Sequence, residues 1–248
     1  MISYSLKDDI GILKLNRPDK RNALHPTLVK QMKEKLNEVR DDDKVKVLII
    51  TGEGKAFCAG ADLSYLSELR NFSSIENEKD SEDLAELFLM IYKFPKPTIA
   101  AVNGAAIAGG CGLASVCDLI VADEDNSSFG YSEVKIGFIP AMVSIFIINR
   151  IGEGIARQLL LTGEIINGKR AYEVGFVNYI YNNVLEGSID VASNICQSSN
   201  FSVKQTKSMI NSLLGLSVED AVNYCIRLNA ISRSSEDFKN GLDSFLKK

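Results

Sequence analysis

Apolar and polar positions alternate along the chain with two different periods. Residues 10–16 (IGILKLN) and 45–52 (VKVLIITG) are short apolar runs rich in branched side chains, and each ends at a turn. Such runs are typical of buried strands. Residues 25–42 follow the helical period instead, with apolar positions at Leu28, Met32, Leu36 and Val39. The pattern therefore predicts strand, turn and helix in succession.

The alternation continues through the first two-thirds of the chain. Residues 98–104 (TIAAVNG) and 117–123 (CDLIVAD) read as strands. A helix before them carries its apolar face at Leu84, Leu87, Phe88 and Ile91 and is stopped by FPKP. The preceding residues 73–83 (SSIENEKDSED) are acidic and polar, so we expect a solvated, mobile connection there. No repeat is strong enough to indicate a solenoid.

The last fifty residues have a purely helical pattern. Apolar positions recur there at helical spacing, for example at Ala221, Cys225, Leu228, Phe238 and Leu242. A helical segment this short has little core of its own and must pack on the body or on another subunit. We therefore expect a core over residues 1–195 and a C-terminal helical region over residues 196–248.

Composition narrows the class of protein. The 248 residues are 46% apolar, enough for a substantial core, and the net charge of −4 argues against a nucleic-acid partner. No uncharged apolar run is long enough to cross a bilayer, and the N-terminus enters a strand pattern almost at once, with no signal peptide. We expect a soluble cytoplasmic protein without a membrane or nucleic-acid partner.

The cysteine and histidine residues of the sequence offer little support for a metalloprotein or for thiol-based catalysis. The five cysteines are dispersed, odd in number and without CxxC spacing, which is typical of reduced, buried thiols in the cytosol. The single histidine, His25, excludes a His-rich metal site and argues against a Cys–His nucleophile pair. We expect no metal and no redox cofactor.

Two glycine-rich stretches each join a strand to a helix. In residues 51–66 (TGEGKAFCAGADLSYL) the phosphate-loop spacing GxxxxGK[ST] is absent and GxGxxG is incomplete. What remains is a tight turn, with AGAD opening a helix whose first amides have no intrahelical partner. A plain strand-to-helix turn explains this stretch equally well.

The second stretch, residues 101–115, repeats the arrangement with Gly109 and Gly110 opening the helix. Without Cβ atoms, backbone and ligand approach closely. Amides from two helix N-termini that converge on one oxygen would form an oxyanion hole. Tight helix packing through small residues is the alternative, and both can hold together.

Glu133 is the candidate acid–base group. It lies in residues 129–141 (FGYSEVKIGFIPA), in a neighbourhood with few other charges. Apolar surroundings raise the pKa of a carboxyl group, which suits proton transfer near neutral pH. The alternative is an exposed glutamate or one paired with Lys135.

Taken in order, these stretches resemble a known family. LNRPDKRNAL (15–24), GEGKAFCAGADL (52–63), AAVNGAAIAGGCGLASVCDLIVA (100–122), FGYSEVKIGFIPA (129–141) and LLLTGEIINGKRAYEVGFVN (159–178) closely resemble the crotonase family of enoyl-CoA hydratases and isomerases. The resemblance covers roughly residues 4–180. It implies an α/β fold, a spiral of ββα units, with a C-terminal helical region that forms a homotrimer or a hexamer.

The resemblance also implies an acyl-CoA thioester as substrate, in fatty acid metabolism. Its enolate is held by the backbone N–H groups matching Ala61 and Gly109, and Glu133 transfers protons. The stretches KRNAL and AGADLS match those along which the coenzyme A arm lies. The substrate-binding candidates are Lys20, Arg21, Ala23, Ala59, Asp62, Leu63, Ser64 and Gly110.

The chain departs from the usual hydratase pattern at two positions. Hydratases of this family commonly have a second glutamate where this chain has Gly112, and relatives place an acid where it has Ala141. Paired carboxylates suit hydration, because one activates water and the other protonates C2. A lone carboxylate suits moving a double bond from C3 to C2. An acid from residues 64–83 (Glu68, Glu76 or Glu78) could replace the missing one.

A further likeness favours hydration. The run SEVKIGFIPAMVS (132–144), with Ala141 and Met142 in place of the usual glycines, is similar to a subgroup regarded as hydratases of branched enoyl-CoA substrates that also lack the second acid. We therefore expect an enoyl-CoA hydratase; a Δ3,Δ2-enoyl-CoA isomerase, other enolate chemistry and a non-catalytic acyl-CoA binder are the alternatives. Asp118 we expect to be structural, accepting hydrogen bonds from turn amides.

Overall fold

Two β-sheets organise the chain, and the computed structural model describes residues 1–247 of it. The larger sheet has the strand order β1-β2-β3-β5-β7-β10, antiparallel between β1 and β2 and parallel from β2 onward. Its strands are β1 (Ile2–Lys7), β2 (Ile10–Leu15), β3 (Val47–Gly52), β5 (Thr98–Val102), β7 (Leu119–Ala122) and β10 (Tyr179–Ile180). The strands expected near residues 10–16, 45–52, 98–104 and 117–123 are confirmed.

The smaller sheet has the order β4-β6-β8-β9. Its strands are β4 (Ala56–Cys58), β6 (Ala105–Ile107), β8 (Ser128–Gly130) and β9 (Ile165–Asn167). The first three run parallel to one another, and β9 is antiparallel to β8. Because the three parallel strands share one direction, their carboxyl ends meet at one edge of this sheet.

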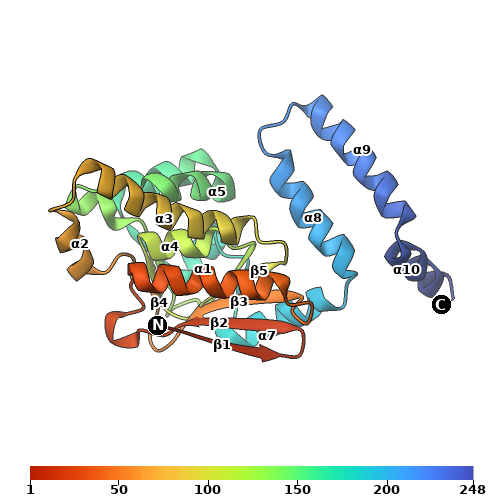
Figure 1. Ribbon diagram of the computed structural model, residues 1–248, viewed down its shortest axis with the longest axis horizontal. Helices are drawn as coiled ribbons and strands as arrows, with labels where there is room; N and C mark the ends of the chain where they lie inside the picture. The colour runs from red at the N-terminus through yellow and green to blue at the C-terminus, as the bar shows by residue number, and fades with distance from the viewer. Residues whose placement is uncertain (248) are drawn as a thin grey trace.

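Helices cover both faces of the larger sheet. Figure 1 shows α1 (Pro26–Asp41) and α3 (Ser74–Tyr92) on one side and α7 (Val184–Cys196) on the other. Strand β3 faces both layers, because Leu48 and Ile50 belong to the main core while Val47 and Ile49 pack toward α7. The remaining helices of the body are η1 (Pro18–Lys20), α2 (Leu63–Leu69), α4 (Gly109–Ser115), η2 (Ser132–Ile136), α5 (Ala141–Thr162) and α6 (Gly168–Glu173).

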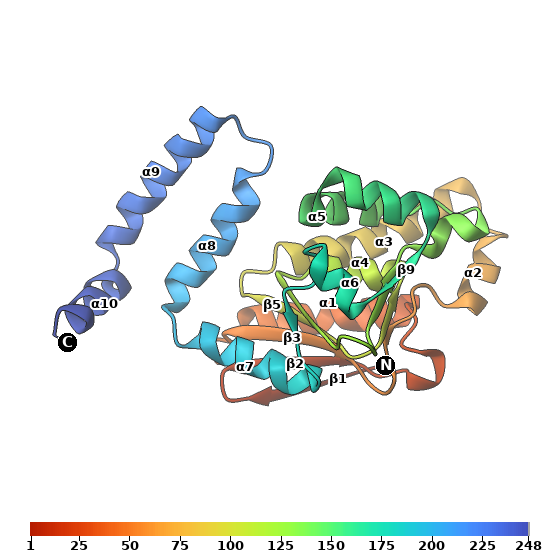
Figure 2. The same cartoon turned by 180° about the vertical axis from the view of Figure 1, so that it is seen from behind.

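The C-terminal region is helical, as expected, and extends away from the body. It consists of α8 (Asn200–Leu213), α9 (Val218–Ser234) and α10 (Glu236–Leu246). Figures 1 and 2 show α8 and α9 side by side, with the sheet and its helices beyond α8. Helix α8 is anchored to the body by Lys207, whose Nζ lies 2.7 Å from Asp118 Oδ2. The division into domains at residue 195 stays a prediction.

The expectation of a mobile connection over residues 73–83 is wrong. Helix α3 begins at Ser74, and Ser73 caps it: the Glu76 N–H donates to the Ser73 Oγ, and the Ser73 N–H donates to the Glu76 carboxylate. This reciprocal arrangement satisfies two amides that a helix start leaves unpaired. The acidic residues that suggested a solvated loop are the exposed first turns of a helix whose apolar face begins at Leu84.

Candidate active site

The carboxyl ends of β4, β6 and β8 bring three predicted motifs together. Cys58 pairs with Ala106, and Ile107 pairs with Gly130, so the chain leaves all three strands at the same edge. Ala61, Gly109 and Glu133 each follow within three residues of their strand. Ligands in open α/β folds commonly bind at such an edge.

The two glycine-rich turns lie in close contact. A Cβ built on Gly60 would be 2.9 Å from the Ile107 carbonyl oxygen and 3.6 Å from the Gly109 nitrogen. Gly60 has a φ of 86° and Ala108 a φ of 51° with ψ of −124°. A left-handed φ is a costly backbone state for alanine and is often found at functional sites. The chain thus bends sharply just before both Ala61 and Gly109.

The amides of Ala61 and Gly109 are left without partners. The neighbours of Ala61 are paired, because the Leu24 N–H donates to the Gly60 carbonyl over 2.7 Å and the Asp62 N–H donates to the Leu24 carbonyl over 2.9 Å. Within residues 1–247, neither the Ala61 nor the Gly109 N–H donates a hydrogen bond to another residue. Two free amides on adjoining turns are the donors that an oxyanion needs.

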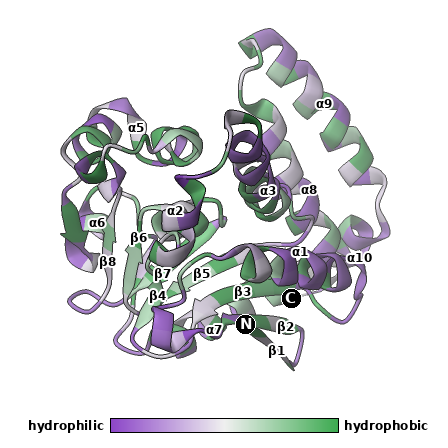
Figure 3. Ribbon diagram, turned by 60° about the vertical axis from the view of Figure 1, so that its left-hand side comes forward, coloured by the Kyte–Doolittle hydropathy of each residue, from purple (hydrophilic) through white to green (hydrophobic). Residues whose placement is uncertain are grey.

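Both residues line a large cavity of the body, together with Glu133. It has a volume of about 1270 Å³ and is walled by α1, α2, α3, η2 and the start of α5. Figure 3 shows α2 at the centre of the view, with α5 and α3 on either side. The lining is mostly apolar and includes Leu24, Val29, Leu66, Leu84, Phe88, Ile139, Met142 and Val143.

Glu133 is a buried carboxyl group in this cavity. The residue belongs to η2 and is only 8% exposed. Burial raises its pKa above the ordinary value of 4.5. Its Oε2 has no hydrogen-bond partner, and within the described chain no cation pairs with it. The alternatives of an exposed glutamate and of a pair with Lys135 are therefore wrong.

The other two glycines of α4 serve packing. A Cβ on Gly110 would lie 2.0 Å from the Cys58 carbonyl oxygen, so Gly110 lets α4 sit against β4. A Cβ on Gly112 would lie 2.3 Å from Val143 Cγ1. Close packing of small residues is thus the role of Gly110 and Gly112, whereas Gly109 lines the cavity. The space that the side chain of a second acid at position 112 would need is therefore occupied by Val143.

The predicted substrate-binding residues fall into three groups. Ala59 and Leu63 line the cavity, and Leu63 is 80% exposed there. Lys20 and Arg21 are exposed beside it, and the Arg21 carbonyl accepts the Ala59 N–H over 3.0 Å. Lys20 and Arg21 do not line the cavity themselves, and neither do the remaining four: Ala23, Asp62, Ser64 and Gly110.

Asp62 has a structural role that the sequence did not reveal. Its carboxylate accepts from the Ser64 N–H, which caps α2, and from Arg17 Nη2 over 2.8 Å. Hydrogen bonds from Ser64 and from Arg17 hold the pKa of this carboxyl group well below its usual range. Asp62 therefore fixes the turn that carries Ala61.

Sequence reasoning missed a polar cluster in the lining of the cavity. The Tyr65 hydroxyl donates to the Asp80 carboxylate, the His25 ring lies 5.7 Å from the Tyr65 ring, and all three residues line the cavity. Residues 64–83 thus do supply acids to the lining, Asp80 and Asp83, but these are not the expected Glu68, Glu76 or Glu78. Tyr65 and Asp80 are fifteen residues apart on different helices, so only the fold brings them together.

The cysteine thiols and the possible metal ligands of the described chain show no sign of a second reactive site. Burial raises the pKa of the thiols of Cys58, Cys111 and Cys117 to about 12, which keeps them unreactive. No group of three or more His, Cys, Asp or Glu side chains in residues 1–247 could hold a metal ion. None of the described helices is both long and apolar enough to span a membrane.

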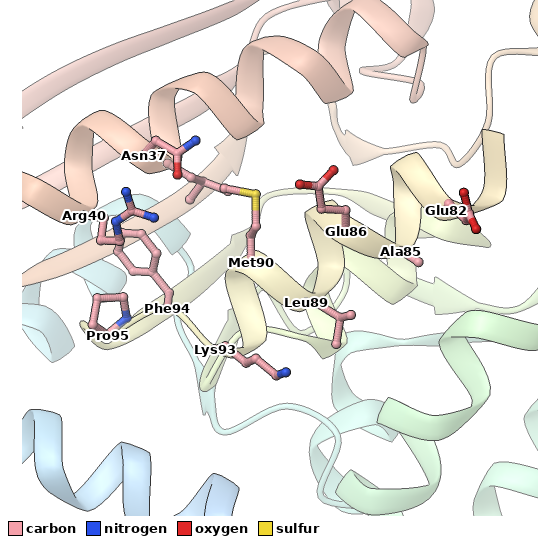
Figure 4. A pocket seen from close by; sticks show the side chains of 11 residues that line it. Asn37, Arg40, Glu82, Ala85, Glu86, Leu89, Met90, Lys93, Phe94 and Pro95 are labelled. Carbon is pink, nitrogen blue, oxygen red and sulfur yellow. The ribbon is translucent and has the colours of Figure 1, made fainter. Parts of the chain in front are cut away.

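A smaller hollow of about 480 Å³ lies between α1 and α3 (Figure 4). Met90 and Phe94 line it, with Arg40, Glu86 and Lys93 among its charged residues. None of the predicted catalytic or substrate-binding residues lines it.

Comparison with known proteins agrees with this fold. The family model described as enoyl-CoA hydratase/isomerase matches residues 6–248. A Thermus thermophilus protein named "Putative enoyl-CoA hydratase" is 38% identical over 244 residues, covering 98% of this chain and 96% of that protein. The crotonyl-CoA hydratase of Syntrophomonas wolfei is 32% identical over 246 residues, covering 98% and 93%.

Solved structures agree as well. The crystal structure of an enoyl-CoA hydratase from Shewanella pealeana superposes with a TM-score of 0.94 at 30% identity, covering 99% of this chain and 93% of that one. The α/β fold is thus shared with an enoyl-CoA hydratase of known structure. The chain is a member of the enoyl-CoA hydratase/isomerase family, the crotonase family, and the predicted fold is confirmed.

Proposed function

We propose that this protein is an enoyl-CoA hydratase that adds water across the 2,3 double bond of an enoyl-CoA. The observation that carries the proposal is the buried Glu133 carboxyl group, which shares one cavity with the free Ala61 and Gly109 amides. A proton-transfer group and two oxyanion donors in one apolar cavity fit chemistry at the carbons next to a thioester. The relatives named as hydratases support the choice.

The reaction follows from these three groups. The thioester oxygen accepts hydrogen bonds from the Ala61 and Gly109 N–H groups. The Glu133 carboxylate takes a proton from water as the water oxygen bonds to C3, and the electrons of the double bond move to the thioester oxygen as an enolate. Protonated Glu133 then delivers its proton to C2. One carboxyl group thus gives and takes one proton, and the product is a 3-hydroxyacyl-CoA.

The coenzyme A arm leaves the cavity past the turn after β4. Ala59 and Leu63 line the cavity at this turn, and the exposed Lys20 and Arg21 lie close by, because the Arg21 carbonyl accepts the Ala59 N–H. Cationic side chains there suit the phosphates of the coenzyme. The apolar lining suits a hydrocarbon acyl group. The similarity of residues 132–144 to the subgroup regarded as hydratases of branched enoyl-CoA substrates supports a branched acyl chain. The thioester is the substrate, and the proposed chemistry involves no metal and no redox cofactor.

A specific observation favours a second candidate, Δ3,Δ2-enoyl-CoA isomerisation. Val143 stands where a side chain at position 112 would lie, so the second carboxyl group of a two-acid site has no room. With one carboxyl group, Glu133 would take a proton from C2 of a 3-enoyl-CoA and return it to C4 through the same enolate.

Product mass separates the candidates. The protein is incubated with trans-2-butenoyl-CoA and, separately, with trans-3-hexenoyl-CoA, and products are analysed by chromatography and mass spectrometry. Hydration adds the mass of one water to the first substrate. If the second substrate is converted to its 2-enoyl isomer at unchanged mass and the first is not hydrated, the hydratase proposal is wrong and the isomerase is supported. Inertness toward both, with tight binding, would indicate an acyl-CoA binder.

We also propose that the protein assembles as a homotrimer or hexamer in the cytoplasm. The C-terminal helices expose apolar side chains in regular order, including Ile210, Val222, Ile226, Ile231, Phe238 and Leu242. A face of this kind is suited to a neighbouring subunit. Five free cysteines suit a reducing compartment. Sedimentation velocity distinguishes the 27.2 kDa monomer from a trimer or hexamer.

A further inference from the structure

Val143 occupies the space beside Gly112 on the wall of the cavity. A Cβ on Gly112 would meet Val143 Cγ1 at 2.3 Å, Val143 Cβ at 3.2 Å and Phe88 Cε2 at 3.2 Å. Val143 and Phe88 both line the cavity, although they are only 4% and 1% exposed. The two side chains therefore form an apolar part of the cavity wall, and they also cover position 112.

This wall lies close to the reacting end of the substrate. Gly112 is three residues after Gly109 on α4, and residues at that spacing are neighbours on one helix face, with Cβ atoms roughly 5–6 Å apart. The Gly109 N–H is a proposed donor to the thioester oxygen. A side chain against position 112 is thus near the first acyl carbons rather than near the far end of a long chain.

The wall is firmly supported from behind. The Phe88 ring packs edge-on against Phe146, with ring centroids 6.4 Å apart, and Phe146 packs on Tyr92 at 5.4 Å. Val143 belongs to the first turn of α5, and Ile147 one turn later is fully buried. Because a packed core relaxes only partly after truncation, removing methyl groups from Val143 enlarges the cavity at this point.

We propose that Val143 is a specificity-determining residue that sets how much bulk the enzyme accepts at the acyl carbons nearest the thioester. The inference rests on the acyl-CoA binding part of the proposed function, but not on which reaction follows. An extra methyl group near C3 contacts the Val143 methyl groups, whereas a longer unbranched chain extends past them. The three atoms nearest a position-112 Cβ belong to Val143 and Phe88, and the Phe88 ring is held in place by its packing on Phe146.

The test is a binding measurement, so that it is independent of turnover. Affinities of butanoyl-CoA, 3-methylbutanoyl-CoA and octanoyl-CoA are measured by calorimetry for the wild type, for Val143→Ala and for Val191→Ala. Val191 is 6% exposed and packs between α7 and the sheet, outside the cavity, so it matches both the burial and the chemistry of the substitution. A methylene in an apolar pocket changes discrimination by roughly 10–200-fold.

We expect Val143→Ala to raise the affinity for 3-methylbutanoyl-CoA relative to butanoyl-CoA about tenfold, with the octanoyl-to-butanoyl ratio little changed. Val191→Ala should leave both ratios at the wild-type values. An unchanged branched-to-straight ratio in a folded Val143→Ala protein, or a gain confined to octanoyl-CoA, would overturn the assignment. Failure of the wild type to bind all three esters would overturn acyl-CoA binding itself, whereas binding without hydration would leave the Val143 assignment standing.

Discussion

Arg17 and Asp62 form a nearly buried ion pair directly beside a proposed oxyanion donor. Arg17 Nη2 lies 2.8 Å from Asp62 Oδ2, and the two side chains are 12% and 5% exposed. Arg17 Nη1 also donates to the Ala23 carbonyl over 2.7 Å. The pair ties the turn before α1 to the turn carrying Ala61, so it fixes the direction of the Ala61 N–H.

Breaking this pair should cost stability in a pH-dependent way. Asp62→Asn leaves the Arg17 cation without its partner, and we expect a loss of about 3 kcal/mol in the free energy of unfolding at pH 7, measured in urea. Because the folded-state pKa of Asp62 is depressed, its contribution is present above the ordinary value and is lost as the pH falls below about 4. Glu53→Gln, which breaks the exposed Lys14–Glu53 pair, should cost less than about 1 kcal/mol. Equal losses in both variants would contradict the structural role.

Replacing Glu133 should separate binding from chemistry. Glu133→Gln keeps the shape of the side chain and removes the proton-transfer group, so we expect kcat to fall by roughly 10²–10⁴-fold. Binding of butanoyl-CoA, measured by calorimetry, should stay within about twofold of the wild type. Turnover that survived in Glu133→Gln would refute the assignment of the catalytic group.

The burial of Glu133 predicts the pH dependence of both activity and stability. If the carboxylate is the base, kcat/KM rises with pH through a midpoint above 4.5, the ordinary value from which burial raises the pKa. The folded state holds this proton more tightly than the unfolded chain does. The carboxyl group therefore costs stability increasingly as pH rises from the ordinary pKa through the raised one.

Urea unfolding of the wild type and Glu133→Gln at several pH values checks the stability part. The variant should gain stability relative to the wild type as pH rises through this window. A constant difference between the two proteins from pH 4 to pH 8 would indicate an unshifted carboxyl group.

Gly112 and Val143 should be energetically coupled. Gly112→Ala adds a Cβ 2.3 Å from Val143 Cγ1, and the overlap costs about 1–3 kcal/mol, against a helix-propensity gain of about 1 kcal/mol. Val143→Ala removes the obstructing methyl groups. In a double-mutant cycle by urea unfolding, the double variant should therefore be more stable than the sum of the single losses by about 1–3 kcal/mol. Additive losses would show that α5 moves freely away from α4.

Lys207 should control the docking of α8 on the body. Its Nζ donates to Asp118 Oδ2 over 2.7 Å and to the Lys96 carbonyl over 3.0 Å, while the Thr98 N–H donates to the same carboxylate oxygen over 2.6 Å. Asp118 is thus structural, as expected. Lys207→Met should cost about 1–3 kcal/mol, because the partly buried carboxylate loses its cation.

Limited proteolysis of Lys207→Met should then cut faster between α7 and α8, at residues 197–199. Lys239→Met, which removes the exposed pair with Glu236, is the control and should leave the cleavage rate unchanged. Wild-type cleavage kinetics in both variants would mean that other contacts hold α8, such as the hydrogen bond from Asn211 Nδ2 to the Tyr92 carbonyl over 3.0 Å.

The local pattern of apolar and polar residues determined much of the secondary structure of this protein. The strand at residues 45–52 and the helix at 25–42 follow from the spacing of their apolar residues, because period and burial are linked within one element. The order of the glycine-rich turns and of the Glu133 stretch indicated the family, and with it the fold. The same reasoning failed at residues 73–83, because it weighed polarity and overlooked the Ser73–Glu76 cap, a helix signal that was present in the sequence.

Tertiary structure alone decided the relationships between distant segments. The burial of Glu133, the approach of Gly60 to Gly109 and the contact of Val143 with position 112 all depend on how strands β4, β6 and β8 and helices α4 and α5 pack. Gly112 in the sequence shows only that an acid is missing; the packing shows that its place is taken. The physical reason is that periodicity reports which face of an element is buried, whereas the identity of the neighbour on that face is set by long-range packing.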